Sequence, residues 1–507
     1  MSQPPEPQPW YGYPRPQLPV EGNPYAQGGT GPQRPRRKGL RGGPGAVVAA
    51  LVAGLLLGGG GMYAFLGGGG TTTPAKPTVQ ETTKPPKATA SSPAASKTPD
   101  AADINARRVA GDARAWLGGN DADLPRRTVL LNDLWTVGDT IVQAVYKEVT
   151  AYKLSDGAKV WSVPLPGPVC ETPVNTTPDG KVVIAYKNTP SGQGGQCDQL
   201  RMIDLKTGTA GWHKELTSTG AMDGTISLRT AITGDTVMVV QNMWAAAYRV
   251  GDGARLFVSA VDNPGDCYPD EVAGGTRLLQ IDTCAVGGDA SFGQVKELDP
   301  RTGKVKWRWR TQKGWAVSKV YSVDPVVVTT YDRKDSLDTW RIVALKPDGK
   351  LRSTLATKKG AFKQCADTGD SGRGAQNCPG AAVGPNTLYL GSESKLAAFD
   401  LNTGKLSWGV QAEDGRRMYP LRAEGDAVIA YGGPSSREAG RVVRIAGRGD
   451  KVTRLLRHPD SAREVEFGMF AGNLAYGNGR VVITPSVVNG DDKVQEPRML
   501  SFGPDTP

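Results

Sequence analysis

The sequence predicts an all-β fold, an eight-bladed β-propeller, preceded by a disordered N-terminus and one transmembrane helix. Three observations support this prediction. One short phrase recurs through most of the chain, the 507 residues include 66 glycines and 38 prolines, and residues 45–66 carry no charge. Frequent Gly and Pro suit short strands joined by turns. Repeats of about 20–50 residues with β content are typical of propeller blades and solenoids.

The first two segments of the chain are expected to lie outside the globular fold. Residues 1–44 are rich in Pro, Gly, Gln and Tyr and end in a basic run. They lack the branched apolar residues that a core needs, so we expect them to be disordered. Residues 45–66 are uncharged, and a helix of this length spans roughly 33 Å, enough for a bilayer core of about 30 Å. We therefore expect an uncleaved transmembrane helix.

A cleaved signal peptide is the alternative for residues 45–66. Its N-terminal region would be unusually long, and no small-residue cleavage site follows cleanly. A lipoprotein anchor would need a cysteine near the span, whereas the first cysteine is Cys170. The basic run before the span predicts a cytoplasmic N-terminus. The Pro/Thr/Lys-rich residues 67–102 are then expected to form an extracellular spacer.

Residues 103–507 repeat one phrase, whose clearest copy reads AFDLNTGKLSW. The copies cover residues 151–161, 202–212, 247–257, 297–307, 344–353, 398–408 and 443–453, and their shared glycines lie 45–55 residues apart. β-branched runs bounded by Gly and Asp precede most copies and predict buried strands. The Asp-x-x-Thr-Gly element predicts a hairpin turn, because Gly tolerates positive φ and Asp bonds the nearby backbone.

The number of blades follows from the repeat length. Residues 103–507 hold slightly more than eight repeats, and the last unit, from about Ala471 to Phe502, ends before its fourth strand. A segment around Ala113–Leu117 is expected to supply that strand and close the ring, which removes open sheet edges. Seven blades is the alternative. The aromatic residue that closes each phrase should pack on the neighbouring blade, so the predicted blade-docking residues are Trp161, Trp212, Trp307 and Trp408.

The cysteines form an even set that lies entirely after the uncharged stretch. They are Cys170, Cys197, Cys267, Cys284, Cys365 and Cys378. Their position and number predict disulfides formed in an oxidising compartment. Six cysteines allow many pairings. We favour the three consecutive pairs, because each closes a loop within one repeat unit or within the loop that leads into it. A zinc site is disfavoured, since C-x-x-C spacing is absent.

The phrase A-x-D-x-x-T-G-x-x-x-W resembles the docking motif of the pyrroloquinoline-quinone (PQQ) dehydrogenase-like β-propellers. Ala398, Asp400, Thr403, Gly404 and Trp408 match every position of this motif, and other copies lose one or more. The superfamily that this motif resembles contains quinoprotein dehydrogenases. It also contains non-catalytic members, such as an outer-membrane assembly lipoprotein whose propeller is a scaffold. The resemblance implies a fold and leaves the activity open. We place the chain in a non-catalytic, membrane-anchored branch.

The resemblance also implies what a catalytic member would contain. It would hold PQQ beside a disulfide between adjacent cysteines, with Glu, Asn and Asp calcium ligands and an aspartate base. The present sequence has no adjacent cysteines and no C-x-x-C-H haem motif. We therefore expect no catalytic and no cofactor-binding residues.

Two further motifs are weak signs of chemistry. Residues 369–372 read Gly-Asp-Ser-Gly, as around a protease nucleophile, but neither His213 nor His458 lies in a context that suits a triad. An acidic group around Cys267 could offer oxygen ligands to calcium, yet its spacing does not follow an EF-hand. That group consists of Asp262, Asp266, Asp270 and Glu271. We expect no metal site.

Charge and loops complete the functional expectation. The net charge is +11, but residues 103–507 hold 51 basic and 46 acidic residues, a balance that argues against nucleic-acid binding. We expect a monomeric extracellular propeller that binds a protein or an envelope component without catalysis. Loops at Ser191–Gln199 and Gln364–Pro379 are the longest candidate contact surfaces. The alternative is an enzyme or sensor with PQQ or calcium at the propeller channel.

Overall fold

The computed structural model describes most of the chain from Asp100 onward. The described residues are 100–118, 123–191, 194–216, 228–241, 243–259, 266–287, 289–335, 339–355, 362–365, 374–376, 378–469, 472–490 and 497–504. The chain divides into two units, Met1–Ser92 and Pro93–Pro507, and every described residue lies in the second. Among these residues no helix is long and apolar enough to cross a membrane. The segments 1–44 and 45–66, and the spacer up to residue 99, lie outside the described residues.

Eight four-stranded antiparallel sheets make up the fold, which confirms the eight-bladed propeller and excludes seven blades. Blade 1 contains β3 (Leu134–Val137), β4 (Thr140–Val145), β5 (Glu148–Lys153) and β6 (Lys159–Pro164); blade 2 contains β7 (Val169–Glu171), β8 (Lys181–Lys187), β9 (Cys197–Asp204) and β10 (Thr209–Glu215). Blade 3 contains β11 (Leu228–Thr233), β12 (Thr236–Gln241), β13 (Trp244–Arg249) and β14 (Arg255–Ser259); blade 4 contains β15 (Cys267–Ala273), β16 (Leu278–Cys284), β17 (Phe292–Leu298) and β18 (Val305–Arg310).

The second half of the ring follows the same plan. Blade 5 contains β19 (Trp315–Val323), β20 (Val326–Asp332), β21 (Trp340–Leu345) and β22 (Leu351–Leu355); blade 6 contains β23 (Ala381–Val383), β24 (Thr387–Gly391), β25 (Lys395–Asp400) and β26 (Leu406–Gln411). Blade 7 contains β27 (Met418–Glu424), β28 (Ala427–Gly432), β29 (Arg441–Ala446) and β30 (Lys451–Arg457); blade 8 contains β31 (Leu474–Gly477), β32 (Arg480–Ile483), β34 (Met499–Gly503) and β1 (Arg114–Gly118).

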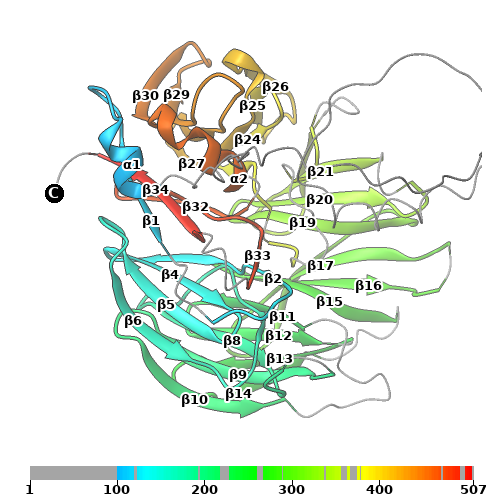
Figure 1. The fold of residues 1–507 in the computed structure, drawn as a ribbon. Coiled ribbons are helices and arrows are strands. Elements are labelled where there is room, and N and C mark those ends of the chain that lie inside the picture. The colour runs from blue at the N-terminus through cyan, green and yellow to red at the C-terminus, as the bar shows by residue number, and fades with distance from the viewer. Residues whose placement is uncertain are drawn as a thin grey trace, which may run out of the picture. The chain divides into compact units, whose positions relative to one another are not determined.

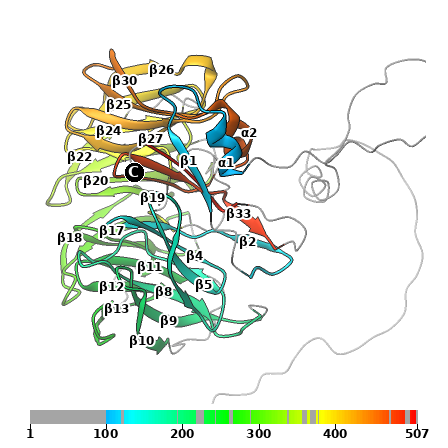
Figure 2. The same cartoon turned by 60° about the vertical axis from the view of Figure 1, so that its left-hand side comes forward.

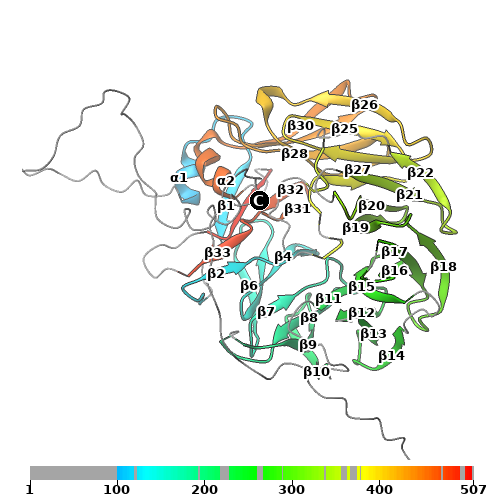
Figure 3. The ribbon, with the colours of Figure 1, turned by 90° about the vertical axis from the view of Figure 1, so that its right-hand side faces the viewer.

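The strand order gives the propeller two different faces. The first strands of neighbouring blades contact one another at the centre, as β7 does with β11 and β11 with β15, while outer strands such as β14, β18 and β22 lie along the rim (Figure 3). Because successive strands alternate in direction, the first and third turns of each blade lie on one face, here called the turn face. The second turn and the link to the next blade lie on the other, the loop face.

The core lies between the blades. All six residues of β12 are buried, because a second strand is covered by a blade on either side, and such strands become continuous apolar runs. Leu278 of blade 4 packs in one cluster with Met238 of blade 3, whereas its neighbour Leu279 packs in another with Val328 of blade 5. The alternation of side chains along each strand thus divides the core into successive inter-blade layers.

Blade 8 is completed by a strand from the start of the described chain. β1 pairs antiparallel with β34, with Arg114 opposite Gly503, and it coincides with the strand expected around Ala113–Leu117. Arg457, at the end of β30, donates from Nε to the Asp112 carboxylate over 2.6 Å. Segments almost 350 residues apart in sequence therefore close the ring.

Most blades are docked by an aromatic residue lying on the next blade's turn glycine. Trp161 lies over Gly208, Trp212 over Gly253, Trp307 over Gly349 and Trp408 over Gly449, and Trp116 and Phe257 lie in the same way over Gly157 and Gly303. These glycines have positive φ. A Cβ at Gly208 would lie 2.6 Å from the Trp161 ring, so only glycine lets the indole approach.

Small elements cover the loop face beside blades 7, 8 and 1. They are α1 (Ala101–Ala106), η1 (Glu413–Gly415), η2 (Asp460–Ala462), α2 (Arg463–Met469) and the two-stranded ribbon of β2 (Thr128–Leu130) and β33 (Val487–Asn489). Figures 1 and 2 show α1 beside α2, and the Ser461 hydroxyl, in η2, donates to the Ile104 carbonyl over 2.9 Å. Asp100 caps α1 through the Asp103 amide.

Candidate functional site

The three disulfides all belong to the loop face. They join Cys170 to Cys197, Cys267 to Cys284 and Cys365 to Cys378, the consecutive pairs favoured from the sequence, and the described part of the chain has no free cysteine. The first ties inner strand β7 to the start of β9, two strands away in the same blade, and the second ties the start of inner strand β15 to the end of the neighbouring strand β16. The third lies in the link between blades 5 and 6. Disulfides at these positions brace long loops and indicate folding in an oxidising compartment.

Charged side chains join the inner strands of blades 2, 3 and 4 at the centre of the ring. Arg229 of β11 donates from Nε to Glu271 of β15 over 2.9 Å, and its Nη1 lies 3.6 Å from Glu171 of β7. Next to them, Thr172 donates its hydroxyl to Asp133 over 3.0 Å. We call Glu171, Arg229 and Glu271 the inner network.

A segment from the link between blades 5 and 6 fills the space beside the inner network. The Ala375 amide donates to Glu271 Oε2 over 3.1 Å, and the Ala375 carbonyl accepts from the Val320 amide over 2.8 Å. Gln376 exchanges two hydrogen bonds with the Gly274 backbone, each 2.7 Å long. The segment 374–376 therefore lines the inner strands of blades 4 and 5.

Side chains from blades 2 and 5 also contact this region. Asn175, which follows β7, donates to the Gly274 carbonyl over 2.9 Å. Lys319 of β19 is 6% exposed and donates to the Gly374 carbonyl over 3.4 Å. Blades 2, 4 and 5 are thus linked through the ring's centre by neutral and charged hydrogen bonds.

Burial alters the acidity of the inner network. Desolvation raises the pKa of Glu171 well above its usual value, against the Coulombic pull of Arg229. Desolvation likewise raises the pKa of Glu271, and Arg229 again opposes the shift. One guanidinium therefore serves two buried carboxylates. The backbone amides of Thr230 and Ala375 donate to the same two carboxylates, over 3.4 and 3.1 Å.

The residues of the inner network do not fit PQQ, the cofactor of the enzymes that the repeat motif resembles. PQQ carries several carboxylates, and here it would meet Glu171 and Glu271, while Arg229 already serves both. The three disulfides join cysteines far from adjacent. Across the described ranges no group of three or more His, Cys, Asp or Glu side chains is placed to hold a metal ion.

The acidic residues around Cys267, which could have offered ligands to calcium, make separate contacts. Asp270 accepts from the Thr283 hydroxyl over 2.9 Å, whereas Glu271 belongs to the inner network. Asp266 lies in a turn with a φ of 44°, and Asp262 lies outside the described residues. Asp270 and Glu271 do not converge on one point.

The protease-like motif and the histidines have other settings. Residues 369–372 lie outside the described residues. His213 Nε2 is 2.7 Å from Gln199 Oε1 on the neighbouring strand. His458 is buried, with Nδ1 2.6 Å from the Glu466 carboxylate, and it stacks on Phe502. Both histidines are engaged in local packing, and neither faces a hydroxyl nucleophile in these contacts.

Part of the sequence matches a known family model. Residues 130–266 match the family described as outer membrane protein assembly factor BamB, a range that covers blades 1 to 3. These blades carry PQQ-like repeats. The docking geometry, an aromatic ring on a turn glycine, extends the same PQQ-like pattern to blades 4 and 7, where Phe257 and Trp408 take part.

Solved structures with PQQ-like propellers are also similar. BamB from Moraxella catarrhalis is 15% identical over 75% of this chain and 100% of its own, with a TM-score of 0.42. Quinohemoprotein alcohol dehydrogenase from Comamonas testosteroni is 14% identical over 78% of this chain and 76% of its own, with a TM-score of 0.45. No curated protein sequence matches the chain significantly.

Three features of the site went unnoticed in the sequence. Trp116 docks blade 8 on blade 1, and its position in the predicted closing strand could have revealed it. Ser353 stands where a docking tryptophan is expected, and its hydroxyl donates to the Leu401 carbonyl over 2.7 Å. The equivalent bond elsewhere runs from the Trp212 indole to the Val250 carbonyl. Arg229 carries no sequence signal, since only the ring brings its partners together.

Proposed function

We propose that this protein is a membrane-tethered extracellular propeller that binds a protein or an envelope component through its loop face, without catalysis. The observation that carries the proposal is the contrast between the two faces. The long links, the three disulfides and the β2–β33 ribbon all belong to the loop face. Binding surfaces are commonly built from loops held on a rigid scaffold.

Exposed apolar side chains on the loop face support a contact role. Leu130 and Val487 lie directly opposite each other in the ribbon and are 60% and 40% exposed. Met243, Val286 and Phe467, in loops or on α2 of the same face, are also largely exposed. Aromatic, aliphatic and Met side chains are the usual anchors of protein interfaces.

The centre of the ring supports a binding role over a cofactor-dependent one. The segment 374–376 and the inner network fill that region with mutually satisfied groups. A shallow pocket of about 310 Å³ lies instead on the loop face, between residues 123–125 and the β4–β5 turn at Tyr146 and Lys147. This pocket makes a concave site on the face that we expect a partner to contact.

The tether rests on the sequence. Residues 45–66 are uncharged, follow a basic run and precede a Pro/Thr/Lys-rich segment. A single-pass helix there would hold the propeller outside the cell, in the oxidising environment that its disulfides need. The propeller is proposed to act as a monomer on this tether.

Photo-crosslinking on intact cells tests the proposal. The full chain would carry a photoreactive phenylalanine at Met243, Val286 or Val487 on the loop face. Matched controls would carry it at Leu406 or Val452, which are 57% and 53% exposed on outer strands at the rim. We expect one discrete crosslinked product from loop-face positions and none from the rim.

Two results would contradict the proposal. Equal crosslinking from rim and loop-face positions would show that the loop face is not a selective contact surface. An absence of products at all three loop-face positions, in cells where the protein is exposed to added protease, would show that no stable partner binds there.

A further inference from the structure

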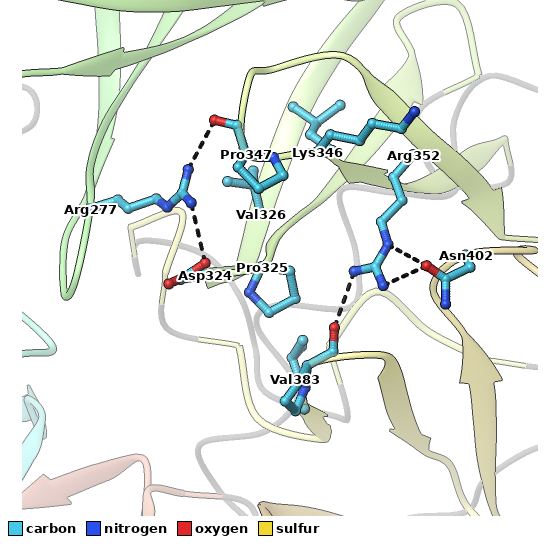
Figure 4. A pocket seen from close by; sticks show the side chains of 12 residues that line it. Arg277, Asp324, Pro325, Val326, Lys346, Pro347, Arg352, Val383 and Asn402 are labelled. Carbon is cyan, nitrogen blue, oxygen red and sulfur yellow. Dashed lines mark hydrogen bonds and ion pairs between the residues drawn. The ribbon is translucent and has the colours of Figure 1, made fainter.

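A pocket of about 560 Å³ opens on the turn face, across blades 4, 5 and 6 (Figure 4). Three cations, Arg277, Lys346 and Arg352, and one carboxylate, Asp324, contribute to its lining. The volume falls within the range of about 300–1,000 Å³ that is typical of small-ligand pockets. The pocket lies on the face opposite to the proposed partner surface.

One of the cations is neutralised within the protein. Arg277 lies with Nη2 3.4 Å from Asp324 and Nη1 3.0 Å from Glu297. Its Nη1 also donates to the Pro347 carbonyl over 3.3 Å (Figure 4). Arg277 therefore fixes one wall of the pocket and contributes little net charge.

Among the described residues, Arg352 forms its hydrogen bonds with neutral oxygens, and the Asp400 carboxylate interacts with it only through Coulombic attraction. Arg352 donates to the Asn402 side chain from Nε and Nη2 over 3.1 and 2.8 Å, to Asn386 over 2.7 Å and to the Pro385 carbonyl over 3.1 Å. These bonds orient the guanidinium without cancelling its charge. One N–H group of Nη1 is left to bind an anion.

Lys346 adds positive charge at the turn of the blade 5 phrase. Three other phrases have an aspartate at this position, such as Asp299, which accepts from the Thr302 amide over 2.9 Å, and two have Lys153 or Arg249. The blade 5 turn keeps Asp348, which pairs with Lys350 over 2.9 Å and does not line the pocket. Lys346 thus places a cation where blades 2, 4 and 6 have a carboxylate.

Rigid apolar groups complete the pocket. Pro325, Pro347 and Pro385 contribute walls, together with Val326 and Val383. Such walls suit the apolar body of a ligand and not a bare ion. When a ligand covers them, apolar surface is removed from water, which stabilises the complex.

We propose that this pocket binds an organic anion, in which a carboxylate or phosphate group is carried on an apolar body. Lys346 is exposed and forms no ion pair within the described part of the chain, so its ammonium is available to the anionic group. Arg352 supplies a fixed second charge, and the prolines cover the apolar body. The inference goes beyond the proposed function, since it requires no partner on the loop face.

Ligand-observed NMR on the purified full chain tests the proposal with three probes: phenyl phosphate, benzoate and benzyl alcohol. We expect saturation transfer to the anions and affinity for benzyl alcohol that is at least about tenfold lower. Lys346→Gln should weaken anion binding about threefold to fivefold, the range for an exposed charge pair. Arg352→Gln should weaken it further, by about tenfold or more.

The matched control is Lys206→Gln, because Lys206 also lies in the turn of a repeat phrase, in blade 2, but outside the pocket. It should leave binding unchanged. Lys346 contributes to the turn through its backbone, which Lys346→Gln keeps, and its exposed side chain forms no ion pair within the described part of the chain. This variant therefore remains informative if Arg352→Gln unfolds blade 5. A preference for phenyl phosphate or for benzoate identifies the anion, and either preference supports the site.

Three results would overturn the proposal. They are equal affinity for benzyl alcohol, equal loss of binding in the Lys206 and Lys346 variants, and no saturation transfer from either anion at millimolar concentration. The first would show a merely apolar pocket, the second diffuse surface charge, and the third an empty cleft.

Discussion

Single residues decide how each blade meets the next. The turn glycine has a positive φ and no Cβ atom, so the indole or phenyl ring of the preceding blade can lie directly on the turn backbone. Ser353 shows which part of the contact can be replaced: its hydroxyl reaches the Leu401 carbonyl as an indole N–H would. Strand β22 then moves close to the turn, and the Thr354 carbonyl lies against Gly404.

Gly208→Ala tests this contact. The variant should lose stability twice, once from placing Ala at a φ of 72° and once from contact with the Trp161 ring. Gly138→Ala is the matched control, because Gly138 has a φ of 61° and a methyl group added there would have no neighbour within 4 Å. The control should cost about 1–2 kcal/mol, and Gly208→Ala about 1–3 kcal/mol more. Urea unfolding measures both, and equal losses would refute the docking role.

The inner network should make stability depend on pH. Glu171 and Glu271 have pKa values raised by burial, so the folded chain binds protons that the unfolded chain releases. The free energy of unfolding should therefore fall as the pH rises above 4.5, the ordinary pKa of a glutamate, and through the folded pKa values. Glu171→Gln removes one of these groups and should reduce that fall.

Urea unfolding between pH 5 and neutrality measures the effect in the wild type and in Glu171→Gln. Glu424→Gln, a substitution on a partly exposed carboxylate remote from the inner network, is the control. An identical slope for Glu171→Gln and the wild type would contradict the raised pKa of Glu171.

At the level of secondary-structure elements, the closing strand β1 has the largest effect. It covers the edge of β34 and carries Trp116, whose indole donates to the Leu154 carbonyl of blade 1 over 3.0 Å. Asp112, just before it, receives Arg457 from blade 7. One short strand therefore joins three blades, and its loss would leave β34 as an open edge.

A truncation isolates this role. A chain of residues 119–507 should be less stable than residues 93–507 by at least about 3 kcal/mol, the lower limit for losing one buried aromatic side chain. Thermal unfolding and limited proteolysis of the two chains provide the measurement. Equal melting temperatures would show that blade 8 does not need β1.

At the level of the whole molecule, the two faces have different roles. The turn face is built from short repeats, and its pocket appears where the blade 5 phrase has diverged. The loop face collects insertions and disulfides, and the segment 374–376 fills the centre. The molecule thus separates a proposed partner surface from a proposed anion pocket.

Native mass spectrometry of the exported propeller checks the disulfides and cofactor expectation together. The mass should be six hydrogen atoms below that of the reduced chain, as three disulfides require, and should not change with added calcium or PQQ. Non-reducing peptide mapping should give the pairs 170–197, 267–284 and 365–378. A stoichiometric PQQ or calcium adduct would revive the enzyme or sensor alternative.

The repeating architecture could be predicted from the amino-acid sequence, because blade docking depends on local residues at fixed spacing. The turn glycines, the closing aromatics and the buried β-branched runs recur every 45–55 residues, so the number of blades and the closing strand near Ala113–Leu117 could be predicted. The three disulfide pairs could also be predicted, because consecutive cysteines close short loops. Each of these features lies within one repeat or at its boundary.

The side chains that meet at the centre and on the turn face could not be predicted in this way. Glu171, Arg229 and Glu271 come from three different blades, and residues 374–376 contact them from the link between blades 5 and 6. The pocket likewise needs Arg277 of blade 4 and Asn402 of blade 6 beside Arg352. Such contacts depend on ring closure, which fixes the distances between distant segments and leaves no pattern along the chain.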